Sequence, residues 1–277
     1  MIPQADVINW REIAPWSTDA QVEQDLVLSR ALIEIFSEEA LRRQLALRGG
    51  TALNKLILPS SARYSEDIDL VQIKAGPIGD TLTLLRKRLD PWLGEPKREL
   101  SKGSAKLVYR FNSEIPPVTN LRLKIEINTR EHFTVLGLKS HGLSVKSRWF
   151  SGNVEMQTYQ LEEMLGTKLR ALYQRKKGRD IFDIAVSVKH FPKLSKESVV
   201  KCFHKYMAHG GHKVSRAQYE KNLAEKAQHP AFLKDIEPLL SADGRTDFNL
   251  ETALTLVRND FLPLFPTMLP RLINGGL

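Results

Sequence analysis

The stretch from Asn120 to Asn128, "NLRLKIEIN", alternates apolar and polar side chains without interruption. Successive side chains of a β-strand point to opposite faces, so this pattern predicts a strand with one buried face and one polar face. The polar face carries Lys124 and Glu126. The sequence therefore predicts a sheet with charged groups on one side.

A second strand is predicted by "DIDLVQI", which begins at Asp67. Asp67 and Asp69 lie two residues apart, so they project from the same face about 6–7 Å from each other, whereas Ile68 and Leu70 face the core. Two carboxylates this close repel each other unless a cation lies between them. Mg²⁺ prefers oxygen ligands, often carboxylates together with substrate phosphates. The alternative is an exposed strand end with two solvated aspartates.

A Gly49-Gly50 pair precedes Thr51 at what the pattern predicts to be a helix start. Glycines at such a position let backbone amides approach a triphosphate closely, and a helix N-terminus favours its charge. The alternative is a turn that needs glycine for its geometry only. Together with the aspartate pair, the glycines predict a metal-bound nucleotide.

Glu126 is the candidate for a third carboxylate, which two-metal phosphoryl or nucleotidyl transfer sites usually take from a neighbouring strand. It lies on the polar face of the predicted strand. The alternative is a solvent-facing charge in a stripe of polar residues.

The twelve residues from Lys168 to Arg179 hold six basic side chains. Helical spacing places Lys168 within an apolar stripe, where its charge needs a partner, and a nucleotide phosphate would provide one. Arg170, Arg175 and Arg179 are predicted to form a polyanion-binding surface. The alternative, a solvated helix end, is preferred for the remaining lysines of this run.

Gly178 is predicted to cap the end of this helix, and Asp180 to be the N-cap of the next one with Asp183 as its capping-box partner. Asp183 could instead pair with Lys168 or Arg179. A group of Cys202, His204, His209 and His212 could suggest zinc, but its spacing matches no common zinc pattern.

The remaining sequence indicates an α+β chain with a mixed α/β N-terminal half and a helical C-terminal half. The predicted domains are 1–153 and 154–277. Expected elements are helices at 19–47 and 81–89 (the latter stopped by Pro91), strands at 105–112, 133–138 and 143–145, a loop at 58–61, and helices after 161 with breaks at 178, 191–192, 210–211 and 242–244.

Bulk composition narrows the functional classes. The formal net charge of +9 favours a polyanionic partner. The single cysteine excludes an intrachain disulfide and favours a reducing compartment. No window of about 18 apolar residues indicates a membrane span, and no secretory signal is present. We therefore expect a cytoplasmic protein without a membrane partner.

The motif "RGGTALNKL…RYSEDIDLV" resembles the first motif of the DNA-polymerase-β-like nucleotidyltransferases, and more narrowly the AbiEii/MenT family of type IV toxin–antitoxin and abortive-infection toxins. The stretches "PWSTDAQVEQDLVLSRAL", "EEMLGTKLRALYQRKKGRDIFDI" and "SRAQYEKNLAEKAQHPAFLKDIEPLL" resemble further parts of the same family. The resemblance covers most of the chain.

The resemblance implies a nucleotidyltransferase lobe followed by a helical lobe, with the active site between them. It assigns Gly49 and Gly50 to the nucleotide-binding turn and Asp67 and Asp69 to Mg²⁺. It assigns Lys168 to the nucleotide phosphates and Asp183 to the catalytic aspartate that follows. Thr51, Arg63 and Ser65 are further nucleotide-binding candidates, although Thr51 stands where the superfamily often has serine.

The expected function is transfer of a nucleoside monophosphate from an NTP to an RNA, with the 3′ end of tRNA as the candidate acceptor, which would block translation. A DNA-binding antitoxin encoded nearby is the implied partner. Two alternatives stay open at this point: transfer to a small molecule or protein side chain, and a non-catalytic nucleic-acid-binding module with structural aspartates.

Overall fold

The computed structural model describes residues 2–58, 62–241 and 248–266, which form two compact units. The first unit runs to Leu161 and includes residues 238–247, and the second holds residues 162–237 and the chain from Phe248 onward. The sequence analysis placed the domain boundary after residue 153. That position lies inside the last strand of the first unit, Ser151–Tyr159.

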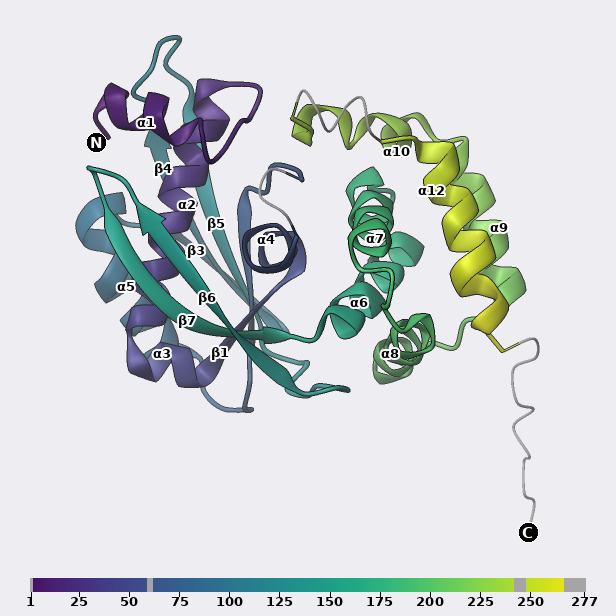
Figure 1. The fold of residues 1–277 in the computed structure, drawn as a ribbon. Helices are drawn as coiled ribbons and strands as arrows, with labels where there is room; N and C mark the ends of the chain where they lie inside the picture. Colours follow the sequence, from purple (N-terminus) through teal and green to yellow (C-terminus); the bar gives the residue numbers. More distant parts are fainter. Residues whose placement is uncertain (1, 59–61, 242–247, 267–277) are drawn as a thin grey trace. The chain divides into compact units, whose positions relative to one another are not determined.

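One mixed seven-stranded sheet organises the first unit, in the order β3-β4-β5-β2-β1-β7-β6 (Figure 1). The pairs β2–β5 and β1–β7 are parallel, and all other neighbours are antiparallel. The mixed α/β organisation predicted for the N-terminal half is confirmed. The strands are β1 (Leu45–Arg48), β2 (Asp67–Gln72), β3 (Lys97–Ser101), β4 (Ser104–Asn112), β5 (Asn120–Asn128), β6 (Leu138–Lys146) and β7 (Ser151–Tyr159).

The two alternating stretches form the strands predicted for them. In β5 every second residue from Leu121 to Ile127 is buried, and the residues between them are partly exposed. In β2 the side chains of Ile68 and Leu70 are fully buried, whereas Asp67 and Asp69 are half-buried. The period-two pattern therefore identified correctly which face of each strand turns toward the core.

Helix α2 (Asp19–Ser37) packs on the sheet and is buried along most of its length (Figure 1). Thr18 caps it through a capping box with Gln21. The buried Asp25 accepts hydrogen bonds from two tryptophan indoles and from Lys55 Nζ at 2.7 Å, so this carboxylate is fully partnered. The other helices of the unit are α1 (Gln4–Trp10), α3 (Glu39–Gln44), α4 (Gly49–Ala52), the π-helical turn η1 (Leu53–Ile57) and α5 (Gly79–Leu93).

The helix predicted for 19–47 is wrong at its C-terminal end, because Leu45, Ala46 and Leu47 form strand β1. All three are fully buried between β2 and β7 in the interior of the sheet. A short strand buried on both faces is a continuous apolar run, which periodicity cannot distinguish from a buried helix.

Three further expectations differ from the structure. Helix α5 continues through Pro91 and ends at Leu93, and Gly94, whose φ of +77° is left-handed, is its C-cap. The two short strands expected near 133–145 are replaced by one strand, β6, that begins at Leu138. Strands β3 and β7 were not predicted, and β3 is exposed throughout, so it carries no alternation to detect. The predicted loop positions 59–61 and the break at 242–244 lie outside the described residues.

The second unit is helical, as predicted. Its helices α6 and α8 pack closely, because a Cβ on Gly166 would lie 2.5 Å from Cys202 Cβ and 2.8 Å from the Val199 carbonyl oxygen. No helix in the described part of the chain is long and apolar enough to cross a bilayer. The elements that follow β7 along the chain are α6 (Leu161–Gln174), α7 (Gly178–His190), α8 (Lys196–His209), α9 (Arg216–Ala227), α10 (Pro230–Lys234), α12 (Leu250–Leu256) and the short turns η2 (Glu237–Leu239), η3 (Val257–Phe261) and η4 (Leu262–Leu264). Most of η2 belongs to the first unit.

Candidate active site

The polar face of the sheet carries a row of charges across four strands. Arg48 of β1 lies opposite Asp69 of β2, Asp69 lies beside Glu126 of β5, and Glu126 lies opposite Lys106 of β4. Adjacent strands are about 4.8 Å apart, so Asp69 and Glu126 are direct neighbours. The row therefore places two carboxylates side by side between two cations.

Asp67 lies in the next row, where its cross-strand partner is Lys124. Lys124 Nζ is 2.9 Å from Asp67 Oδ2 and 3.4 Å from the Glu126 carboxylate. Burial lowers the pKa of the Lys124 ammonium, but three neighbouring carboxylates outweigh it, and the net change is upward. The sequence analysis treated Lys124 only as part of a polar stripe. The pairing of β2 with β5 would have revealed its partner.

Lys124 offsets the buried charge of the Asp67 carboxylate only in part. Burial raises its pKa above the ordinary value, although Lys124 acts in the opposite direction. Its Oδ1 is buried and has no hydrogen-bond partner among the described residues. A buried carboxylate oxygen without a partner is costly. Asp67 and Asp69 together therefore offer oxygen ligands that fit a divalent cation.

Glu126 is held by other groups. It accepts a hydrogen bond of 2.9 Å from Ser104 and lies within 3.5 Å of both Lys106 and Lys124. Burial favours its neutral form, but these donors lower its pKa below the usual value. Within the ranges that the structure describes, no three His, Cys, Asp or Glu side chains are arranged to hold a metal. The residues present thus fit a two-carboxylate site better than a three-carboxylate one.

The glycine pair forms a tight turn against these carboxylates. Gly49 has φ of +78°, a left-handed conformation that side chains disfavour. A Cβ there would lie 2.5 Å from Asp69 Oδ2, and a Cβ on Gly50 would collide with the Arg63 guanidinium. Helix α4 begins at Gly49, as predicted. Gly49 is therefore required by close approach as well as by backbone geometry, and Gly50 by the close approach of the Arg63 side chain.

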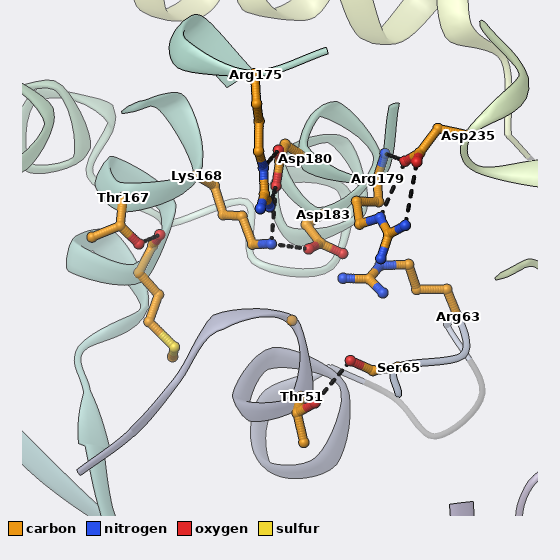
Figure 2. Close-up of polar contacts among 12 residues, drawn as sticks. Thr51, Arg63, Ser65, Thr167, Lys168, Arg175, Arg179, Asp180, Asp183 and Asp235 are labelled. Carbon is orange, nitrogen blue, oxygen red and sulfur yellow. Dashed lines mark hydrogen bonds and ion pairs between the residues drawn. The ribbon is translucent and has the colours of Figure 1, made fainter. Parts of the chain in front are cut away.

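Thr51 and Ser65 lie behind this turn and contact each other. Their hydroxyl oxygens are 2.8 Å apart (Figure 2). The Thr51 hydroxyl also donates to the Asp67 carbonyl oxygen. Arg63 Nη1 donates to the Tyr64 carbonyl oxygen at 2.8 Å. Thr51 is buried, and its hydrogen bond to the Asp67 carbonyl oxygen links helix α4 to strand β2, which carries the two aspartates.

Arg48 and Glu131 form a contact that the sequence analysis missed. Arg48 Nη1 is 2.6 Å from Glu131 Oε2, and Glu131 also accepts from Asn128. Burial alone would lower the pKa of Arg48, but the nearby carboxylates of Glu131 and Asp69 outweigh it, and the net change in pKa is upward. Arg48 directly precedes the glycine turn, so this pair fixes where the turn begins. No local sequence signal connects the two residues.

In the second unit, Lys168 of α6 lies between two aspartates of α7 (Figure 2). Its Nζ is 2.8 Å from Asp183 Oδ2 and 3.2 Å from Asp180 Oδ1. All three side chains are buried. Asp180 also receives two hydrogen bonds of 2.7 Å from Arg175. Burial raises the pKa of Asp180, but Lys168 and Arg175 lower it below the usual value.

This geometry corrects two helix assignments. Gly178 does not end a helix but begins α7, and a Cβ there would lie 2.5 Å from the Phe232 carbonyl oxygen. Lys177 is the N-cap, so Asp180 is neither the cap nor part of a capping box. The Asp180 carboxylate instead forms ion pairs with Lys168 and Arg175. The predicted pairing of Asp183 with Lys168 is present.

The three arginines expected to bind RNA all contact other side chains. Arg175 pairs with Asp180, and Arg179 pairs with Asp235 at 3.1 Å (Figure 2). The Arg170 guanidinium lies 5.0 Å from the centre of the Tyr206 ring. These contacts argue against the three arginines as the main polyanion-binding surface, because each guanidinium is already engaged.

Two members of the cysteine and histidine group, Cys202 and His204, pack in the second unit. Cys202 is buried in the contact between α6 and α8, and burial raises the pKa of its thiol to about 12. His204 packs against Phe203 and Phe265, and burial lowers its pKa. Both residues therefore serve the core of the second unit.

Comparison with known proteins identifies the family. The model of the nucleotidyl transferase AbiEii toxin family, from type IV toxin–antitoxin systems, matches residues 30–255. The chain belongs to the AbiEii family. It is therefore a nucleotidyltransferase of a toxin family, and the family implies an NTP substrate and an antitoxin partner. The resemblance seen in the sequence is confirmed.

Two solved structures share the fold of this AbiEii protein. A protein from H. pylori assigned as a nucleotidyltransferase is 17% identical with a TM-score of 0.55, covering 89% of this chain and 95% of its own. The nucleotidyltransferase toxin MenT4 from Mycobacterium tuberculosis H37Rv is 16% identical with a TM-score of 0.53, covering 93% of this chain and 100% of its own. A sequence search among curated proteins gave no significant match.

Proposed function

We propose that this AbiEii protein transfers a nucleoside monophosphate from an NTP to the 3′ end of an RNA, with tRNA as the acceptor, in a Mg²⁺-dependent reaction. The observation that carries the proposal is the pair Asp67 and Asp69 on one face of β2, directly against the glycine turn. Modification of the tRNA 3′ end would block translation and account for toxicity.

The proposed roles follow from the positions of the residues. Asp67 and Asp69 would hold Mg²⁺, and the bound ion would supply Lewis-acid stabilisation of the phosphates. Gly49 lets the backbone of the turn lie directly against the Asp69 carboxylate, so the backbone amides at the start of α4 would be near the phosphates of a metal-bound NTP. Lys168 would neutralise phosphate charge in the transition state.

The remaining candidates are given supporting roles. Thr51 and Ser65 position the turn through their mutual contact, and Arg63 fills the space that Gly50 leaves open. Asp183 orients Lys168 through its 2.8 Å ion pair. Glu126 is proposed to tune Asp69 and Lys124 rather than to bind the metal, since its own donors already satisfy it.

The transfer step itself is a single displacement. The RNA 3′ hydroxyl oxygen forms a bond to the α-phosphorus of the NTP, the bond from that phosphorus to the bridging oxygen breaks, and pyrophosphate leaves. The hydroxyl proton passes to solvent. The α-phosphorus therefore enters the product, whereas the β- and γ-phosphorus atoms do not.

The test uses NTPs labelled at either the α- or the γ-phosphorus, with Mg²⁺ and total tRNA. We expect label in RNA from an α-labelled NTP only, and none with Asp67→Asn or Asp69→Asn. Asp80→Asn, an exposed aspartate in the first turn of α5, is the matched control and should retain activity.

Three results would contradict the proposal: transfer by the Asp67→Asn protein, incorporation from the γ position, and label that appears in protein or a small molecule instead of RNA. Melting curves of the variants establish that loss of activity is not loss of fold.

A further inference from the structure

The segment from Lys189 to Lys213 is a second basic stretch of the second unit, after the run from Lys168 to Arg179. Its 25 residues hold six lysines and four of the chain's seven histidines, but one acidic residue, Glu197. The segment comprises the end of α7, a short connection, helix α8 and the loop that follows. Nothing in the proposed chemistry uses these charges.

Helix α8 has one apolar face that is buried in the core and one basic face that is exposed. Its apolar side chains, including Phe203 and Met207, are buried. Lys201, Lys205 and His209 are exposed at intervals of four residues, so they lie one above the other about 6 Å apart on the outer face. We define the basic surface as the exposed residues Lys189, His190, Lys193, Lys201, Lys205, His209, His212 and Lys213.

Lys201 and Lys205, on the outer face of α8, differ from Lys196 in their ion pairing. Lys196, at the start of α8, pairs with Asp260 at 2.5 Å. Among the described residues, by contrast, no carboxylate forms an ion pair with Lys201 or Lys205. An exposed ammonium without an ion pair can neutralise a phosphate, and this releases cations condensed on the nucleic acid. This distinguishes the lysines from Arg175 and Arg179, whose partners are aspartates.

Helix α8, which carries Lys201 and Lys205 of the basic surface, packs against helix α6, which carries Lys168. Helix α8 packs against Gly166 of α6, two residues from Lys168, at a distance that leaves no room for a side chain. Tyr206 of α8 also donates a hydrogen bond of 2.7 Å to Glu163 of α6. A ligand bound along α8 is thereby held in a fixed relation to Lys168.

We infer that the basic surface binds the sugar–phosphate backbone of the RNA acceptor, an inference that rests on the proposed function. A protein partner fits the surface less well, because lysine is depleted at protein–protein interfaces and their centres are apolar. The exposed large apolar side chains of the described chain, such as Ile8 and Leu100, all lie outside residues 189–213. Backbone phosphates require no apolar centre.

The test is the charge reversal Lys201→Glu with Lys205→Glu. The matched control is Lys221→Glu with Lys234→Glu, which reverses two exposed lysines of α9 and α10 in the same unit. Binding of labelled tRNA is measured without NTP over a range of salt concentrations. We expect the first variant to bind at least tenfold more weakly. The slope of log K against log salt should become shallower by about 1.4–1.8, as for two lost phosphate contacts.

Transfer kinetics complete the test. The KM for RNA should rise in Lys201→Glu/Lys205→Glu, whereas kcat at saturating RNA and the affinity for NTP should match the control. Unchanged RNA binding in this variant would overturn the inference. So would a variant that binds and modifies RNA normally but escapes neutralisation by the antitoxin, because the surface would then belong to a protein partner.

The binding measurement is independent of catalysis. If the wild-type protein modifies no RNA yet binds tRNA through these lysines, the proposed reaction fails and the surface assignment stands. If the wild-type protein modifies RNA and the reversal has no effect, the surface assignment fails and the reaction stands.

Discussion

Replacement of Lys168 by methionine should destabilise the protein as well as inactivate it. The Lys168 side chain is 6% exposed and lies between two aspartate side chains that are 0% exposed. The four charges of Lys168, Arg175, Asp180 and Asp183 sum to zero. Lys168→Met leaves a net charge of −1 in a buried position, and loss of one partner from a buried ion pair costs about 3–5 kcal/mol.

The lower end of this range is expected, because Asp180 keeps its two hydrogen bonds to Arg175. A loss of about 3 kcal/mol corresponds to a Tm lowered by roughly 6–12 °C in a chain of this size. The loss should shrink only as the pH falls below about 4, the ordinary pKa of an aspartate. In the wild-type protein Asp180 has a depressed pKa, so its ionised form contributes stability that disappears at low pH. The Lys168→Met variant has already lost the part of this stability that comes from the Lys168–Asp180 pair, so it has less to lose at low pH.

The double variant Lys168→Met/Asp180→Asn separates structure from chemistry. It restores a net charge of zero, because Asp183 and Arg175 remain, and most of the lost Tm should return. Asp180→Asn alone is the reference for its activity. Lys176→Met, an exposed lysine from the same basic run, is the control for the substitution itself.

Calorimetry and the transfer assay give independent readings. If Lys168 contacts phosphate, the double variant is stable and inactive while Asp180→Asn keeps its activity. If the double variant regains activity together with stability, Lys168 has only a structural role. A Tm of Lys168→Met within 2 °C of the wild-type value would refute the argument from buried charge.

Three further predictions concern the first unit. Gly49→Ala should abolish NTP binding, because the added methyl group meets the neighbouring carboxylate at 2.5 Å. Gly137→Ala, at an equally left-handed position with no atom within 4 Å, should lose only about 1–2 kcal/mol of stability and keep activity. In Lys124→Met, the pKa of Asp67 should rise, so the acid limb of the pH–rate profile should move to higher pH. Lys106→Met, which contacts no aspartate of β2, should leave that limb in place. Chelation of Mg²⁺ should stop transfer and re-addition should restore it, and activity that survives chelation would contradict a metal-dependent reaction.

Local sequence predicted those features that depend on neighbouring residues. Period-two alternation identified β2 and β5 and placed Asp67, Asp69 and Glu126 on polar faces. The glycine pair identified the start of α4. Each of these follows from backbone geometry within a few residues, which is why no knowledge of the rest of the chain was needed.

Contacts between distant segments could not be predicted in the same way. The identity of β1 depends on its position between β2 and β7, which its apolar residues do not specify. Arg179 was expected to bind RNA, but its partner Asp235 lies 56 residues further along the chain. Lys124 meets Asp67 only because β2 and β5 pair in parallel with one particular register.

The sequence by itself therefore determined which side chains are available for chemistry and which face of each element they occupy. The tertiary structure decided which charges neutralise one another. It directed Arg175 and Arg179 to aspartates and placed Lys124 at Asp67. It left Lys201 and Lys205 of α8 without a carboxylate partner among the described residues. The physical reason is that helix and strand periodicities act over a few residues. Ion pairs depend instead on the packing of whole elements.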